Sequence, residues 1–420
     1  MNRYLRSAGA CALAASLILG APAASAMAAD PAPEARASLT NIPVEEFGQH
    51  VPLIISAKDW PTITTGSIRL WDTGVQWRDV NKQQGKYNWA ILDAAVIKAN
   101  EKNATVMYVL GSTPQWAAKN TKVGIKGPGS ASPPKTMDIW NTWVKTVAKR
   151  YKGQIDYYQI WNEANLQNFW TGSPQEMAQM TISAAKIIKA QDPNAKVVAA
   201  STTLRLSKDY NRFFPPYLAG LKKGKWPVQA FGVSSYPAAD GGPDERIALI
   251  QTAQQTLAKA GAPNRPLMDM EVNYGLAGPG AIARPNIFTN DLQAAWASRT
   301  YIDSARLGVS NTYWYSWVPA GPLLGVTVYN GTPAATAINT TAAWLVGGSI
   351  GSCTTSGAVT TCPLTNGGKT YTLAWASGSN TATGSVAAPA AGQVCAVNNN
   401  CTPIAAGASV PVTISPVRIG

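Results

Sequence analysis

The segment Ile155-Asp156-Tyr157-Tyr158-Gln159-Ile160-Trp161-Asn162-Glu163 is a short apolar run that ends on an amide and a carboxylic acid. Its isoleucine and aromatic content is typical of a buried β-strand. A loop and then an amphipathic stretch at 174–190 follow it. A strand followed by a helix is the repeating unit of proteins in which helices cover a parallel sheet. The segment therefore predicts one β/α unit whose polar groups lie at the carboxyl end of its strand.

The same unit repeats along residues 44–346. Candidate strands cover 46–51, 67–71, 104–110, 155–161, 196–201, 228–236, 266–271 and 311–317, and the clearest candidate helices cover 89–102, 137–151, 174–190, 244–260 and 292–307. Eight such units close into a (β/α)8 TIM barrel, which typically takes ~250 residues. A doubly wound open sheet is the alternative fold. The lack of a G-x-G-x-x-G motif after the first strand weighs against it.

Residues 347–420 differ from the rest in composition. They are rich in Gly, Ala, Ser, Thr and Asn, and no acidic residue occurs after Asp303. Short alternating runs at 369–375 and 410–419 predict antiparallel strands. We therefore expect a catalytic barrel at 44–346 and a small C-terminal antiparallel β domain, as an accessory domain, at 347–420.

Four cysteines lie in this last part of the chain, as the close pairs Cys353 with Cys362 and Cys395 with Cys401. In an exported protein the simplest expectation is one disulfide within each pair, although four cysteines allow three connectivities. A zinc site is the alternative. The spacings are not C-x-x-C and the sole histidine, His50, is far away in sequence, so we expect no metal.

The N-terminus predicts export. Arg3 and Arg6 precede an apolar run of small residues, and two A-x-A patterns follow, which is typical of a secretory signal peptide at 1–28. Residues 29–43 are interpreted as a Pro/Ala-rich linker. A membrane anchor is the alternative, but the apolar run is short for a bilayer span of ~20 residues. We expect a secreted protein, extracellular or periplasmic, with no membrane span.

The chain is basic, with a formal net charge of +13 at pH 7. A basic exported protein suits an acidic polysaccharide, a cell surface or nucleic acid as a partner. The Lys and Arg residues are spread through the predicted helices without a basic run or a known binding motif, which argues against nucleic acid. A solvated basic surface is the simpler explanation.

Two glutamates end predicted strands. Glu163 ends the fourth, and Glu271 ends the seventh, in the segment Pro266-Leu267-Met268-Asp269-Met270-Glu271. Barrel enzymes place their reactive groups at such ends, so the two carboxyl groups can face each other across the barrel mouth. A carboxyl pair of this kind is the machinery of glycoside hydrolysis, ~5–5.5 Å apart in retaining enzymes and ~6.5–9.5 Å in inverting ones. Aromatic neighbours of Glu163 should raise its pKa, as a general acid requires.

Several further motifs carry a resemblance to a known family. They are Phe47-Gly48-Gln49-His50, Ile68-Arg69-Leu70-Trp71-Asp72, Trp77-Arg78-Asp79-Val80, Gly85-Lys86-Tyr87-Asn88-Trp89, Thr113-Pro114-Gln115-Trp116 and Ile160-Trp161-Asn162-Glu163. With them, the stretch 44–346 resembles clan A of the glycoside hydrolases, and most of all family 39. The resemblance implies a retaining (β/α)8 enzyme that needs no cofactor.

The resemblance also implies roles. Glu163 would be the acid/base, Asn162 its neighbour that binds a sugar hydroxyl, and Glu271 the nucleophile. Arg69 would help to keep the nucleophile ionised, with a core ion pair as its alternative role. The substrate would be a β-linked oligo- or polysaccharide, such as a xyloside or a bacterial exopolysaccharide, and the basic charge leaves an acidic one open. We expect a monomer.

The sequence departs from the family pattern at two places. Met270 stands where a small or hydroxyl residue usually precedes the nucleophile, and Ser234 replaces the usual histidine of strand 6, although Tyr236 remains and could bond the nucleophile. Asp269 is two residues before Glu271, so we expect both side chains on the same side of the strand, with Asp269 deeper in the barrel and paired, with Arg69 as the candidate partner. Asp269 as the reactive group in place of Glu271 is the alternative.

Other side chains are candidates for substrate binding. His50 should line the mouth after the first strand, or be a satisfied structural histidine. Trp116, Trp170 and Trp317 are expected to line the cleft and stack on sugar rings, and packing in the core is the alternative for each of them. Three other functions stay open: a non-catalytic carbohydrate-binding barrel, a transglycosylase, and a surface adhesin acting through residues 347–420.

Overall fold

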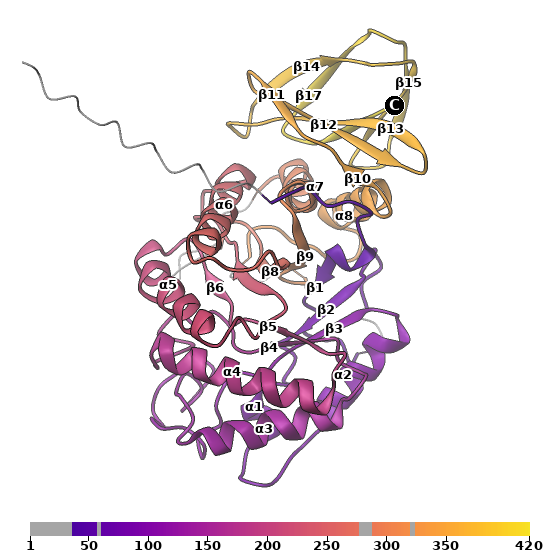
Figure 1. The fold of residues 1–420 in the computed structure, drawn as a ribbon. Coiled ribbons are helices and arrows are strands. Elements are labelled where there is room, and N and C mark those ends of the chain that lie inside the picture. The colour runs from indigo at the N-terminus through magenta and orange to yellow at the C-terminus, as the bar shows by residue number, and fades with distance from the viewer. Residues whose placement is uncertain (1–35, 57–59, 277–287, 320–323) are drawn as a thin grey trace, which may run out of the picture. The chain divides into compact units, whose positions relative to one another are not determined.

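The computed structural model describes residues 36–56, 60–276, 288–319 and 324–420, and its centre is a parallel β-barrel (Figure 1). The predicted signal peptide and the first part of the linker lie outside the described residues. The barrel strands are β1 (Phe47–Gln49), β2 (Ser67–Leu70), β3 (Thr105–Val109), β4 (Tyr157–Gln159), β5 (Lys196–Val198), β6 (Thr202–Thr203), β7 (Phe231–Ser234), β8 (Leu267–Val272) and β9 (Val309–Trp314). Every predicted strand is confirmed.

The barrel is closed because β5 and β6 are two pieces of one strand. The hydrogen-bonded order runs from β5 through β4, β3, β2, β1, β9, β8 and β7 to β6. Val198, at the end of β5, pairs with Ala230, and Thr202 in β6 pairs with Val233 in β7. The two ends of the sheet therefore meet, and the structure is the predicted (β/α)8 barrel with eight strand positions.

Helices surround this barrel in Figure 1. They are α1 (Trp77–Val80), α2 (Ala90–Glu101), α3 (Met137–Arg150), α4 (Pro174–Gln191), α5 (Ser207–Lys223), α6 (Pro243–Lys259), α7 (Asn290–Arg306) and α8 (Pro333–Leu345), with a short 3-10 helix at Val44–Glu46. Ser173 caps α4 by accepting from Glu176 N–H, and the Glu176 side chain accepts from Ser173 N–H. Such a capping box satisfies two of the free N–H groups at the helix start.

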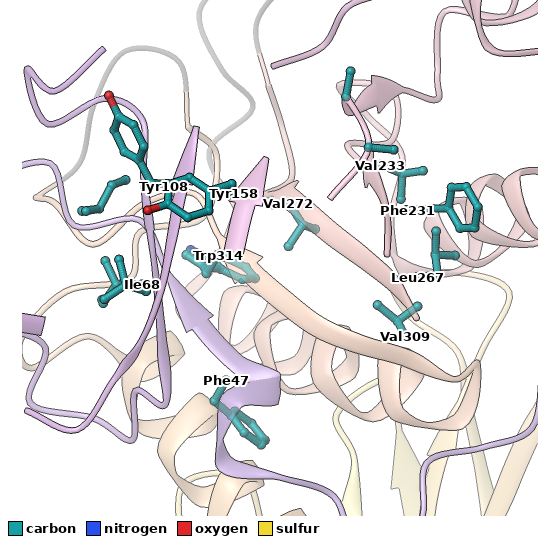
Figure 2. Packing of buried hydrophobic residues seen from close by; sticks show 14 of the residues in the cluster. Phe47, Ile68, Tyr108, Tyr158, Phe231, Val233, Leu267, Val272, Val309 and Trp314 are labelled. Carbon is teal, nitrogen blue, oxygen red and sulfur yellow. The ribbon is translucent and has the colours of Figure 1, made fainter. Parts of the chain in front are cut away.

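Two apolar layers hold the barrel. One lies between strands and helices, and Figure 2 labels part of it: Phe47, Ile68, Tyr108, Tyr158, Phe231, Val233, Leu267, Val272, Val309 and Trp314. The other is a separate cluster inside the barrel, made of Met107, Val198, Ala230, Met268, Met270 and Tyr313. Successive side chains of a strand point alternately out of and into the barrel, and so contribute in turn to the two clusters.

A bulge in β8 decides which acidic residue points inward. In the β7–β8 pairing, Val233 is opposite Asp269 and the next residue, Ser234, is opposite Glu271, so Met270 is an extra residue. Such a bulge changes the side to which the following residues point. Asp269 therefore faces outward, where its carboxylate pairs with Arg246 of α6 at 2.8 Å.

This geometry corrects two expectations about Asp269. Asp269 and Glu271 lie on opposite sides of the strand, because the bulge breaks the alternation between them. Asp269 is paired, as expected of a fully buried carboxylate, but its partner is Arg246, whereas Arg69 pairs with Glu271.

The C-terminal residues form antiparallel strands, as predicted. A seven-stranded sheet contains β10 (Ser349–Ile350), β11 (Thr354–Ser356), β12 (Val359–Asn366), β13 (Lys369–Ala376), β15 (Gly392–Ala396), β16 (Cys401–Ile404) and β18 (Val417–Ile419). A second sheet pairs β14 (Thr383–Ala387) with β17 (Ser409–Thr413). Both expected disulfides are present, Cys353–Cys362 and Cys395–Cys401.

The barrel and the β domain belong to one compact unit, residues 35–420. The guanidinium of Arg299 in α7 lies 4.8 Å from the ring centre of Trp375 in β13. The described part of the expected linker is also packed, since Ile42 is buried and its N–H donates to Gly348 O. Residues 36–43 are therefore part of the fold. Among the helices of the described residues, none has both the length and the apolar character needed to cross a membrane.

Candidate active site

Glu271 is held by two side chains, one from β2 across the barrel and one from the end of the neighbouring strand β7. Arg69 in β2 donates from Nη1 to Glu271 Oε1 at 2.8 Å, and Tyr236, after β7, donates its hydroxyl to Oε2 at 3.1 Å. The Arg69 side chain is fully buried and that of Glu271 is 8% exposed. Both carboxylate oxygens are thus engaged, while the group keeps a narrow opening to solvent.

The same guanidinium reaches the end of β4. Arg69 Nη2 donates to Asn162 Oδ1 at 2.7 Å, and Nε donates to Gln159 Oε1 at 2.8 Å. A guanidinium is a planar fork of donors, so these bonds fix the orientation of Asn162 relative to Glu271. The Asn162 amide oxygen is thus engaged by Arg69. Glu163 follows directly in the chain.

Glu163 has a backbone conformation that is uncommon for a residue with a side chain. Its φ is +40°, in the left-handed region. Its N–H donates to Ser201 Oγ at 2.9 Å, and its carbonyl accepts from Leu166 N–H at 2.9 Å. Surrounding bonds therefore hold a strained residue in place. Strain of this kind gathers at functional sites.

Burial raises the pKa values of both carboxyl groups, and repulsion between them disfavours the state in which both are ionised. Burial, reinforced by the nearby charge of Glu271, raises the pKa of Glu163 to about 8. Burial also raises the pKa of Glu271, but there the hydrogen-bonded Arg69 guanidinium opposes the rise. An arginine stays protonated in proteins, so the ionised form is favoured on Glu271 and the proton on Glu163.

His50 follows β1 at the same mouth and is neutral. Burial, and next the positive charge of Arg69, lower the pKa of His50 to about 3. Its Nε2 lies 2.9 Å from Met270 O. The contact with Met270 O requires a proton on Nε2, whereas Arg69 Nη1, a donor, lies 3.2 Å from the same nitrogen; the shorter contact, to the carbonyl, favours the proton on Nε2. His50 thus fixes the backbone next to Glu271 without adding a charge.

A second polar group adjoins these residues. Tyr315, just after β9, donates its hydroxyl to Asp72 Oδ2 at 2.8 Å, and its ring centre lies 5.0 Å from that of His50. Asp72, just after β2, forms an ion pair with Lys126 at 2.5 Å. Sequence reasoning did not assign these three residues to the site. For Asp72 and Tyr315 the signal was their place after a strand end, whereas Lys126 lies in a long loop.

Two of the three tryptophans expected in the cleft have packing positions. Trp170 is 1% exposed and packs edge-on against Trp161, with ring centres 5.0 Å apart. Trp317 is 1% exposed and packs against Tyr329 at 5.4 Å. Trp116 is half-buried against the core, and its indole N–H donates to a backbone carbonyl. Sugar stacking needs an exposed face, so Trp170 and Trp317 fit the packing alternative instead.

No protein-family model matches the chain. A segment of 159 residues is 24% identical to a beta-xylosidase of Caldicellulosiruptor saccharolyticus, and this match covers 36% of the chain and 30% of that protein. The chain thus spans less than a third of the relative's length.

Solved structures match over nearly the whole chain. A family 39 glycoside hydrolase of Bacteroides cellulosilyticus has a TM-score of 0.69 at 15% identity, covering 90% of this chain and 81% of that one. A family 39 beta-xylosidase of Caulobacter crescentus has a TM-score of 0.64 at 15% identity, covering 92% and 98%. A family 30 endoxylanase of Clostridium papyrosolvens has a TM-score of 0.57 at 18% identity, covering 91% and 97%. The chain shares their fold.

Proposed function

We propose that this protein is a retaining glycoside hydrolase that cleaves β-glycosidic bonds of an extracellular oligo- or polysaccharide. One observation carries the proposal. Arg69 bonds both Asn162 and Glu271, and so joins the ends of β4 and β8 at a site where burial and the charge of Glu271 raise the pKa of Glu163 to about 8. The resemblance to clan A and the shared fold support it.

The first step uses both carboxyl groups. Glu163 gives its proton to the glycosidic oxygen, so the leaving sugar departs as a neutral alcohol. The Glu271 carboxylate attacks the anomeric carbon, and the C–O bond to the leaving sugar breaks as an ester to Glu271 forms. The Asn162 amide faces the ring hydroxyl next to the anomeric carbon, a contact that strengthens in the transition state.

The second step releases the sugar. Formation of the ester removes the negative charge of Glu271, which lowers the pKa of Glu163 and prepares it to accept a proton. Glu163 then takes a proton from water, whose oxygen attacks the anomeric carbon and returns Glu271 to its ionised form. Attack from opposite faces in the two steps leaves the configuration unchanged.

Export and substrate class complete the proposal. The two disulfides favour an oxidising compartment, extracellular or periplasmic. A substrate found there is an oligo- or polysaccharide, and the net charge of +13 suits an acidic one. The matched relatives are named as xylosidases and a xylanase, which makes β-xylosides the first neutral substrates to test.

The test combines product stereochemistry with two variants, one for each carboxyl group. Proton NMR should show the β-anomer as the first product from a hydrolysed β-glycoside. Glu271→Gln should lower kcat by about 10³-fold or more. Glu163→Ala should lose activity on polysaccharide but keep the first step on a dinitrophenyl glycoside, whose leaving group needs no proton, and azide should then restore turnover.

Other outcomes would point elsewhere. First release of the α-anomer would mean inversion, and equal binding of a sugar by all three proteins without hydrolysis would mean a non-catalytic binding barrel. Products longer than the starting oligosaccharide would identify a transglycosylase.

A further inference from the structure

Lys126 reaches the mouth of the site from the loop between β3 and α3. Gly124 and Gly127 on either side of it have φ values of +118° and +116°, which only glycine adopts readily. A Cβ on Gly127 would lie 2.5 Å from Arg78 Nη2. Ile125 N–H donates to Asn168 O at 3.1 Å. The loop is therefore shaped and anchored so that Lys126 has a defined position.

The ammonium group of Lys126 has a defined position, and only some of its hydrogen-bond donors are occupied. It pairs with Asp72 at 2.5 Å and lies 5.9 Å from the ring centre of Trp71. An ammonium has three donor protons, and Asp72 is its one acceptor among the contacts found within the described part of the chain. The ion pair thus occupies one of these donors and leaves the others for an anionic or hydroxyl group.

Exposure rises from the nucleophile outward. The side chains of Glu271, Asp72 and Lys126 are 8%, 14% and 33% exposed. Tyr315 lies between Asp72 and the surroundings of Glu271, because its hydroxyl bonds Asp72 at 2.8 Å and its ring centre lies 6.4 Å from that of Tyr236, which bonds Glu271. Lys126 is thus linked to Glu271 through Asp72 and two tyrosines, and it is the most exposed of the three charged groups, on the solvent side, where a substituent of the bound sugar or the next sugar would lie.

We infer that Lys126, held by Asp72, is a substrate-recognition residue for the carboxylate of an acidic sugar, such as a uronic acid, bound at or beside the site of cleavage. The inference rests on the proposed function. A partly exposed ammonium with free donors favours an anion over a hydroxyl group, since the attraction between opposite charges adds to the hydrogen bond.

The test compares two matched substrates. One is an oligosaccharide with β-linked glucuronate units, and the other is its carboxyl-reduced counterpart with glucose units. Wild type should prefer the acidic form in kcat/KM, and Lys126→Met should reduce that preference about tenfold or more, mainly through KM. Lys126→Arg should keep most of it. Lys122→Met is the matched control, because it removes the same charge from an exposed position of the same loop and should change nothing.

An unchanged ratio of acidic to neutral kcat/KM in Lys126→Met, or an equal loss in Lys122→Met, would overturn the inference. A general structural role would lower both substrates alike, and thermal unfolding of each variant identifies it. Where wild type cleaves neither form, neither oligosaccharide is a substrate, and the proposed function is tested separately on β-xylosides and other β-glycosides. Titration of the two oligosaccharides then decides the inference by itself, because only the acidic one should bind more weakly to Lys126→Met, and equal binding would refute it.

Discussion

Glu163 and Glu271 are identical side chains with different neighbours, and Arg69 makes the difference. The guanidinium bonds Glu271 directly but reaches Glu163 only through space. Two buried carboxylates close together resist double ionisation, so the pair holds one proton, and the ion pair decides which group carries it. In the proposed mechanism, the roles of acid and nucleophile are thus assigned by a third residue.

The proton on Glu163 predicts the alkaline side of the pH profile. The pKa of Glu163 is raised to about 8, so the acid form is present below that pH and is lost as the pH rises through it. For a substrate whose leaving group needs protonation, kcat/KM should fall about tenfold per pH unit above this value. On the acidic side, kcat/KM should fall as Glu271 becomes protonated.

A variant separates this assignment from a pH effect on folding. A dinitrophenyl leaving group needs no proton, and a glutamine side chain does not lose one as the pH rises. With a dinitrophenyl glycoside, the single-turnover rate of Glu163→Gln should therefore show no fall at alkaline pH. Persistence of the same fall in Glu163→Gln would assign it to another group.

Most of the proposed site was predictable from residues at strand ends. Arg69, Asn162, Glu163, Tyr236 and Glu271 lie in or directly after apolar strands, and a barrel gathers such positions at one face. Lys126 was not predictable, because its place depends on the path of a long loop. The burial of Trp170 and Trp317 was equally hidden, since a tryptophan after a strand packs inward or outward according to its neighbours.

At the scale of elements, the periodic pattern located every barrel strand but not the bulge in β8. The segment Leu267–Val272 alternates large and acidic residues, and an uninterrupted strand would place Asp269 and Glu271 on one side. The extra residue is visible only in the pairing with β7. The clearest predicted helices did not include α8, because it has no charged residue to mark a polar face.

The outward direction of Asp269 predicts a change in stability rather than chemistry. Asp269→Asn leaves Arg246 buried without its ionic partner, which should lower the free energy of unfolding by about 3–5 kcal/mol. The folded fraction should keep kcat within about tenfold of wild type. Urea unfolding and burst titration of active sites measure the two quantities. A loss of kcat as large as that of Glu271→Gln, in protein shown to be folded, would instead favour Asp269 as the nucleophile.

At the scale of the whole molecule, the β domain and the barrel share one core. Leu345 of α8 and Trp375 of β13 belong to the same apolar cluster, and Trp375 is fully buried beneath Arg299. Asp244 at the start of α6 accepts from Gly378 N–H at 2.9 Å, which adds a polar contact across the same boundary. A change in composition after residue 346 indicated a second domain, but composition carries no information on how strongly two domains are joined.

This shared core predicts that the two parts unfold together. Trp375→Leu removes buried ring area and the contact with Arg299, and should destabilise the protein by about 2–4 kcal/mol. Calorimetry should show a single transition that moves as a whole to lower temperature. Tyr371→Leu is the matched control on the same strand, because Tyr371 packs on Arg418 inside the β domain and is only half-buried, so its shift should be smaller. Two transitions, with only one of them moved by Trp375→Leu, would show instead that the barrel is stable without the β domain, and the contact at Arg299 would then be a simple docking of independent parts.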